Sequence, residues 1–161
     1  MRLSLFAAAV AALFVWTSGG YLPTNIASHF DSSGTADSFM LRSSYLAVMI
    51  SVVILVPLST TFLGRWIMTL PEDLINLPNK SFWLAAERKE ASLSYISNWI
   101  QWFSIGITMF FCYVHWLVVQ ANSYTPPQLD MLNIYTGLAA MLVALVIGIV
   151  LLMARFNRVT E

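Results

Sequence analysis

The side chains considered as ligands of a divalent metal ion are two histidines, one cysteine and three of the four aspartates. They are His29, His115, Cys112, Asp31, Asp37 and Asp130. Imidazole and carboxylate groups are ligands that suit zinc, so His29 and His115 are the candidate metal ligands. No His-x-x-x-His pair is present, however, and the alternative is that His29 bonds a carbonyl or carboxylate of its own segment and fixes a turn.

Enzyme motifs are absent from the sequence. It contains no His-Glu-x-x-His pair, no Gly-x-Ser-x-Gly elbow and no glycine-rich loop that could cradle a phosphate. Serine, histidine and aspartate all occur, but so many serines are present that their co-occurrence carries little information. The sequence therefore predicts a protein that is not an enzyme, with no catalytic residues and no cofactor.

The composition is that of a membrane protein. Hydrophobic residues make up 58% of the 161 residues and charged residues 10%, whereas soluble domains carry roughly 25% charged residues. The formal net charge is zero, so we expect no nucleic acid partner. The single cysteine excludes an internal disulfide and any multi-cysteine zinc or iron–sulfur site.

Four segments are apolar and long enough to cross a bilayer, which takes about 20 helical residues. They are residues 1–22, 43–63, 98–120 and 131–154, joined by links 23–42, 64–97 and 121–130 and followed by the tail 155–161. Helices satisfy every backbone group in lipid, and each span carries small residues at four-residue spacing, which favour close packing. The predicted fold is an all-α integral membrane protein with a compact bundle of four transmembrane helices.

The basic residues predict the orientation of the bundle. Seven of the eight, all but Arg42, fall on one side if both termini are cytoplasmic. Links 23–42 and 121–130 are then extracytoplasmic, and His115 lies at the outer interface beside Trp116. A cleaved signal peptide at residues 1–20 is the alternative for the first segment, and it leaves link 23–42 on the same side. No charged side chain lies well inside a span, which disfavours an ion-coupled transporter.

Link 23–42, with the residue before it, holds the first candidate binding surface. Its residues are Leu22, Pro23, Ile26, His29, Phe30, Asp31, Gly34 and Asp37. Pro23 ends the first helix, and Asp31 to Gly34 predict a turn. We expect Ile26 and Phe30 to lie on the membrane while His29 and Asp31 face water.

This pattern resembles the segment that follows the first helix in the SdpI-like bacterial membrane proteins, which also defines a widespread domain of unknown function. Its usual form is Leu-Pro, two residues, Ile-Pro, one residue, His-Phe-Asn, two residues and Gly; Ala27 and Asp31 depart from it. The resemblance implies a multi-pass protein of the bacterial inner membrane. It also implies immunity to a secreted peptide toxin, or sensing of that toxin.

Link 64–97 holds the second candidate surface, which we call the inner-link motif. Its residues are Asn76, Pro78, Asn79, Lys80, Phe82 and Trp83. The motif is similar to a stretch in small four-helix members of the same group. We expect Ser81 to cap a helix that lies at the cytoplasmic interface before the third span; an ordinary connecting helix is the alternative.

Together these features predict a non-catalytic binding or regulatory module in the bilayer, with an extracytoplasmic peptide or membrane protein as its partner. Two other classes stay open: a structural or accessory subunit of a larger membrane complex, and a metal-dependent membrane enzyme or transporter. The sequence does not predict the oligomeric state.

Overall fold

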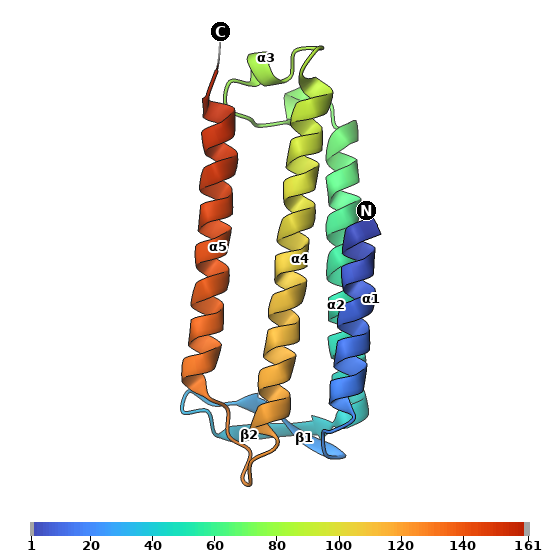
Figure 1. Ribbon diagram of the computed structural model, residues 1–161, viewed down its shortest axis with the longest axis vertical. Helices are drawn as coiled ribbons and strands as arrows, with labels where there is room; N and C mark the ends of the chain where they lie inside the picture. Colours follow the sequence, from blue (N-terminus) through green and yellow to red (C-terminus); the bar gives the residue numbers. More distant parts are fainter. Residues whose placement is uncertain (1, 160–161) are drawn as a thin grey trace.

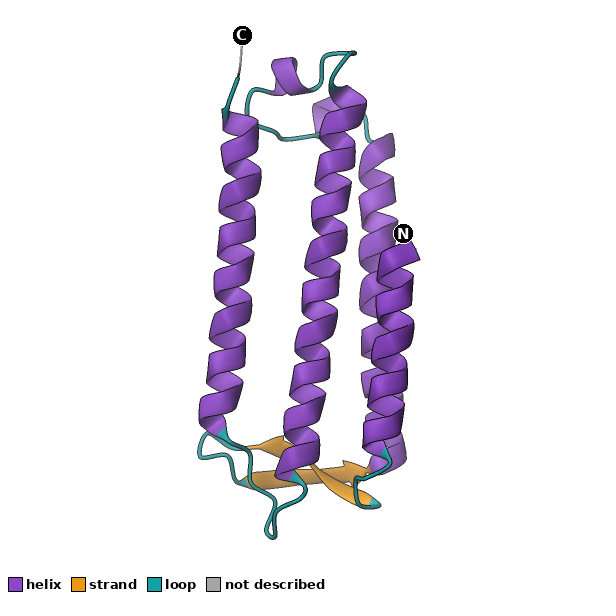
Figure 2. Cartoon of the chain, in the orientation of Figure 1, coloured by secondary structure: helices purple, strands orange, loops and turns teal. Residues whose placement is uncertain are grey.

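The computed structural model describes residues 2–159 and is mostly helical. Four helices run along its long axis (Figure 1): α1 (Arg2–Gly19), α2 (Arg42–Trp66), α4 (Lys89–Ala121) and α5 (Met131–Asn157). Two strands lie across one end, β1 (Asn25–Phe30) and β2 (Ala36–Leu41). Three short helical segments lie at the other end, η1 (Ile67–Thr69), η2 (Glu72–Leu74) and α3 (Lys80–Trp83) (Figure 2).

Three helical stretches are long and apolar enough to cross a membrane. They are Arg42–Thr69, Lys89–Ala121 and Met131–Asn157, and they contain the predicted spans 43–63, 98–120 and 131–154. A shorter apolar helix, Leu3–Gly19, falls within the predicted first span. The 18 residues of α1 extend about 27 Å, slightly less than the ~30 Å hydrocarbon core.

The helix packing is less compact than predicted. Helix α4 contacts α1, α2 and α5, whereas α5 packs chiefly on α4, and none of its most apolar stretch is buried. The small-residue faces agree only in part: Ser104 and Thr108 of α4 are buried, but Ala140 and Ala144 of α5 are exposed. The core is therefore a trio of α1, α2 and α4, with α5 alongside.

Link 23–42 is an antiparallel hairpin. Its register pairs Asn25 with Leu41, Ile26 with Met40 and Ala27 with Phe39, with irregularities nearer the turn. The predicted turn is present, since the Gly34 amide donates to the Asp31 carbonyl oxygen at 2.9 Å. The expected place of Ile26 on the membrane surface is wrong, because Ile26 is fully buried in the core cluster of the helix trio.

Link 64–97 differs from the prediction. The separate interfacial helix is absent from the described residues: α3 has four residues, and Lys89 to Ala121 form one continuous helix of 33 residues. Ser81 lies inside α3 and does not cap it; the residue before α3 is Asn79, in the left-handed conformation with φ 50°. At 1.5 Å per residue α4 extends about 50 Å, well over the ~30 Å thickness of a hydrocarbon core.

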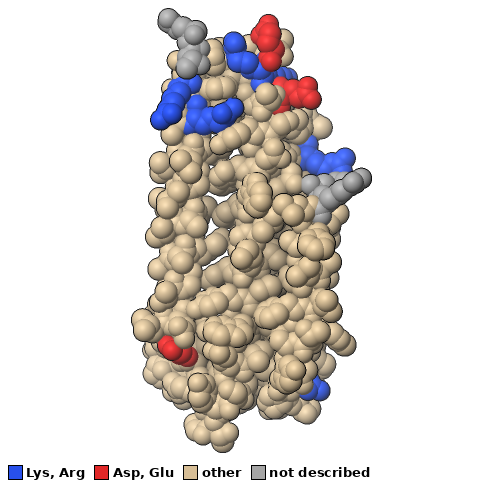
Figure 3. All heavy atoms as spheres, in the orientation of Figure 1, with Lys and Arg blue, Asp and Glu red and all other residues tan. Residues whose placement is uncertain are grey.

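Basic side chains are unevenly distributed along the long axis. Figure 3 shows most lysines and arginines gathered at the end that carries the short helical segments. The elements of that end include Lys80, Lys89 and Arg155, whereas Arg42 begins α2 at the hairpin end.

Candidate functional site

The hairpin end is the first candidate site, and a hydrogen bond between two side chains joins its two strands. His29 Nδ1 lies 2.6 Å from Asp37 Oδ1, with side chains 69% and 46% exposed. This contact agrees with the alternative given for His29 in the sequence analysis, in which it bonds a carbonyl or carboxylate of its own segment. Because both groups face solvent, the pair is worth at most about 1 kcal/mol. It presents a polar, accessible feature on the hairpin surface.

The turn of the hairpin is ordered by the Asp31 carboxylate. Its Oδ1 accepts hydrogen bonds from the Ser33 hydroxyl at 2.6 Å, the Ser33 amide at 2.8 Å and the Thr35 amide at 3.0 Å. These bonds, that from the Ser33 hydroxyl most of all, lower the pKa of Asp31 below 3.8 because they stabilise the charged form. The carboxylate therefore stays ionised at neutral pH.

Link 121–130 supports the turn from outside the hairpin. The Leu129 amide donates to the Gly34 carbonyl oxygen at 2.8 Å, and Gln128 Nε2 donates to the Ser33 carbonyl oxygen at 3.0 Å. Gly34 has φ 83°, and a Cβ there would collide with the Leu129 carbonyl oxygen. Only glycine fits this close approach without strain.

Asn122 fixes β1 to the end of α4. Its Oδ1 accepts from the Ala27 amide at 2.8 Å, and its Nδ2 donates to the Ala27 carbonyl oxygen at 2.9 Å. The side-chain amide thus takes the place of a neighbouring strand. Sequence analysis missed this residue; the only available signal was one asparagine directly after an apolar helix.

Arg42 fixes the start of the hairpin. Its Nη1 donates to the Leu22 carbonyl oxygen at 2.8 Å, and its amide donates to the Thr24 carbonyl oxygen at 2.9 Å. The one basic residue of link 23–42 is therefore committed to the backbone of that link. With Asn122 and link 121–130, it holds the hairpin on three sides.

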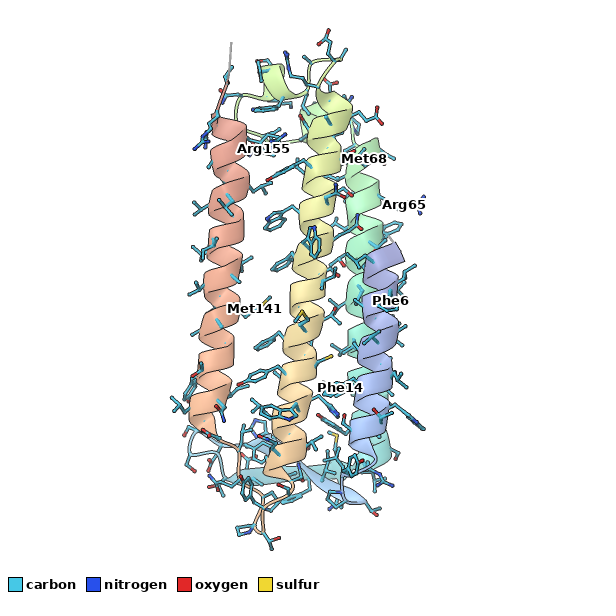
Figure 4. The ribbon with its side chains drawn as sticks, in the orientation of Figure 1. Phe6, Phe14, Arg65, Met68, Met141 and Arg155 are labelled. Carbon is cyan, nitrogen blue, oxygen red and sulfur yellow. The ribbon has the colours of Figure 1, made fainter. Side chains whose placement is uncertain are left out.

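A buried polar cluster lies beneath the hairpin, where α1, α2 and α4 meet. His115 is fully buried; its Nε2 lies 2.9 Å from Ser18 Oγ and its Nδ1 lies 3.0 Å from the Tyr45 hydroxyl. The Tyr45 ring stacks on the imidazole at 5.6 Å, and the edge of Phe14, which points from α1 toward α4, completes the enclosure (Figure 4). His115 therefore faces the interior of the helix trio and is not an exposed residue beside Trp116.

One carbonyl oxygen, that of Phe14, determines which group donates in the hydrogen bond between Ser18 and His115. Ser18 Oγ also bonds the Phe14 carbonyl oxygen, which can only accept, so the serine hydroxyl donates there. His115 Nε2–H then donates to Ser18 Oγ, and in a neutral imidazole Nδ1 accepts from the Tyr45 hydroxyl. His115 is thus not placed to take the proton of Ser18, and the cluster joins three helices through satisfied hydrogen bonds.

The structure does not bring the candidate metal ligands together. His29 lies on the exposed hairpin and His115 in the buried cluster. Within residues 2–159, no three His, Cys, Asp or Glu side chains form a group that could hold a metal ion. Cys112 is a half-buried thiol that lines an apolar groove of about 470 Å³ between α1 and α4.

The inner-link motif binds the end of α5. Asn79 Nδ2 and Trp83 Nε1 donate to the Phe156 carbonyl oxygen at 3.0 and 2.8 Å. Arg155, at the end of α5 (Figure 4), lies over the rings of Tyr95 at 4.3 Å and Trp83 at 5.5 Å. The last carbonyl groups of a helix have no partner within the helix, so the motif caps α5.

The other residues of the inner-link motif surround this contact. Asn76 and Pro78 line a groove of about 440 Å³ with Phe156. The ring of Phe82 lies under the Arg88 guanidinium at 4.0 Å, and Lys80 begins α3. The motif thus has a structural use whether or not it also contacts a partner.

The fold and the hairpin define a helical protein with three helices suited to a membrane, a shorter apolar first helix and an ordered hairpin at one end. Residues 3–55 match the family model described as a domain of unknown function, DUF1648. The matched residues comprise nearly all of α1, the hairpin and the first half of α2. No curated protein and no solved structure matches the chain at a significant level.

Proposed function

We propose that the protein is a multi-pass protein of a bacterial inner membrane, crossed by α1, α2, α4 and α5 with both termini in the cytoplasm. The lengths of the helices and the gathering of basic side chains at the end opposite the hairpin support this orientation. The hairpin then lies on the extracytoplasmic surface. The N-terminal helix is short for a span, and slight local thinning of the bilayer accommodates such a mismatch at modest cost.

Cysteine labelling tests the orientation. In a Cys112→Ser background, Ser32→Cys places a thiol on the exposed turn and Ser81→Cys places one on exposed α3. A maleimide that cannot cross membranes should label position 32 in intact cells and position 81 only after lysis. The reverse pattern would exclude an extracytoplasmic hairpin.

The activity that the geometry supports best is non-catalytic recognition of an extracytoplasmic peptide or membrane protein, in the manner of SdpI-like immunity or sensing proteins. One observation supports it above all. The hairpin is held by Arg42, Asn122 and link 121–130, yet His29, Asp37 and nearly all of β2 remain exposed. A rigid surface loses little conformational entropy on binding, which is the property that a recognition surface needs.

A protection assay tests this activity. Cells that lack the protein and cells that express it are challenged with the peptide fraction from spent medium of the native organism. Expression of the wild type should restore growth, and His29→Ala should abolish protection while membrane abundance on an immunoblot is unchanged. Tyr124→Ala, an exposed change on link 121–130, is the matched control and should protect fully. Loss of abundance in parallel with protection would make His29 structural, and absence of protection by the wild type would refute immunity.

A further inference from the structure

The outer edge of β2 is open, whereas the outer edge of β1 is not. Asn122 pairs with both backbone groups of Ala27, so it occupies the β1 edge as a third strand would. Strand β2 pairs with β1 on its inner side only. Link 121–130 contacts the backbone next to the turn, at Gly34 and Thr35, but among residues 2–159 no backbone hydrogen bond from outside the hairpin and α2 reaches residues 36–41.

The register identifies which groups point outward from that edge. The Ala27 N–H and C=O groups point away from β2, since they bond Asn122, so the opposed pair Ala27 and Phe39 is a non-hydrogen-bonded pair. In such a pair the partner's groups also point away from the shared ladder. The N–H and C=O of Phe39 therefore face out of the sheet, and those of Met40 face Ile26.

The side chains of this edge are apolar and face away from the helices. Successive residues of a strand alternate between faces, and opposed residues share a face. Ile26 is buried against the helix trio and shares its face with Met40, so Phe39 and Leu41 lie on the opposite face. They are 51% and 57% exposed. Ala27, which opposes Phe39, is fully buried, so the accessible apolar surface lies on the β2 side of the hairpin.

We propose that the outer edge of β2 binds an extended, apolar peptide segment as a third strand of the sheet. An open edge is satisfied by another extended backbone, whose N–H and C=O groups repeat at the same spacing; a lipid headgroup or acyl chain offers no such repeat. The exposed side chains beside this edge, Phe39 and Leu41, are apolar, so the edge selects apolar side chains. This inference rests on the proposed recognition function and specifies the class of its partner.

The decisive variant is Phe39→Pro, which removes the outward N–H. Proline is tolerated on an edge strand where its missing N–H faces away from the ladder, so the bonds between β1 and β2 remain. Phe39→Ala is the matched control, because it removes the ring and keeps the N–H. Hydrogen exchange at the Met40 amide, which faces Ile26, verifies that the hairpin is intact in both variants.

The probe is a displayed library of seven-residue peptides selected on the protein in lipid nanodiscs. Selected peptides should be apolar and should bind Phe39→Pro about 5- to 10-fold more weakly than Phe39→Ala, the effect of one lost hydrogen bond. Synthetic copies with N-methyl groups on alternate residues should lose binding to the wild type in one of the two alternating sets only, and this measurement does not depend on any variant folding.

The outcomes separate the two proposals. Peptides that bind Phe39→Pro and Phe39→Ala equally but lose affinity for His29→Ala would overturn strand addition and leave hairpin recognition standing. Both proposals would be overturned if the selected peptides bound every hairpin variant as tightly as the wild type, or if the selection yielded no peptide. If Phe39→Cys in the Cys112→Ser background crosslinks to a second copy in dilute nanodiscs, the edge pairs with itself and the peptide proposal is wrong.

Discussion

Asn122→Ala should loosen the hairpin from the helices. The change removes two hydrogen bonds to Ala27, at 2.8 and 2.9 Å, each worth about 1 kcal/mol net. Ala27 is fully buried, and a buried backbone group without a partner costs a further 1–3 kcal/mol by common estimates. Since water can enter where the amide was, we expect local stability of β1 to fall by about 2–4 kcal/mol.

The assay is hydrogen–deuterium exchange of the Ala27 amide in lipid nanodiscs. A loss of about 2–4 kcal/mol corresponds to exchange about 30- to 700-fold faster, with amides in the middle of α4 unchanged. Asn76→Ala, at an exposed asparagine of the opposite end, is the control and should leave Ala27 unaffected. Exchange at the wild-type rate in Asn122→Ala would refute the account of Asn122 as the partner of β1.

Three further predictions concern the turn and the opposite end. Gly34→Ala places a Cβ at φ 83° against a backbone carbonyl oxygen; it should cost more than the about 1–2 kcal/mol of the left-handed backbone alone, measured as thermal stability in detergent. Gly106→Ala, whose Cβ would meet nothing within 4 Å, should cost nothing. Trp83→Phe removes the indole N–H that donates to Phe156, so exchange should quicken in the last turn of α5 and not in the hairpin. Because hydrogen bonds lower the pKa of Asp31 in the folded state, its ionised form stabilises the turn above pH 3.8, and this stabilisation is lost as pH falls through the lower folded value; the Gly34 amide shift in an NMR titration should follow that transition, and Asp31→Asn should abolish it.

The apolar stretches were readable from the sequence because each is long and continuous. The interfacial helix was not, although the reason was visible in retrospect: no glycine or proline lies between Lys89 and Ile105. Nothing in that stretch breaks a helix, so Lys89 and the residues after it continue straight into the apolar part of α4.

The hairpin was harder to predict because its bonds join distant parts of the chain. The turn at Asp31 to Gly34 follows from local residue types and was predicted. Strand β1 depends on Asn122, which is 95 residues away, and no local pattern records that contact. The two strands are also only six residues each, too short for alternation to stand out.

His115 shows the same limit inside the helices. Beside Trp116 it looked like a residue of the membrane surface, but it is the central member of the buried cluster. Its partners Ser18 and Tyr45 lie 97 and 70 residues away. A lone polar residue on an apolar helix indicates a buried partner; it does not say which one.

The segment that matches the family model depends on hydrogen bonds from residues outside it. Residues 3–55 include Ser18, Tyr45 and Ala27, but the imidazole and the amide that complete them, His115 and Asn122, come from α4. In another scaffold, the polar groups of these three residues would lose the hydrogen bonds that α4 makes to them. A recipient scaffold must supply a third helix that carries an imidazole two turns before a side-chain amide at its C-terminal end.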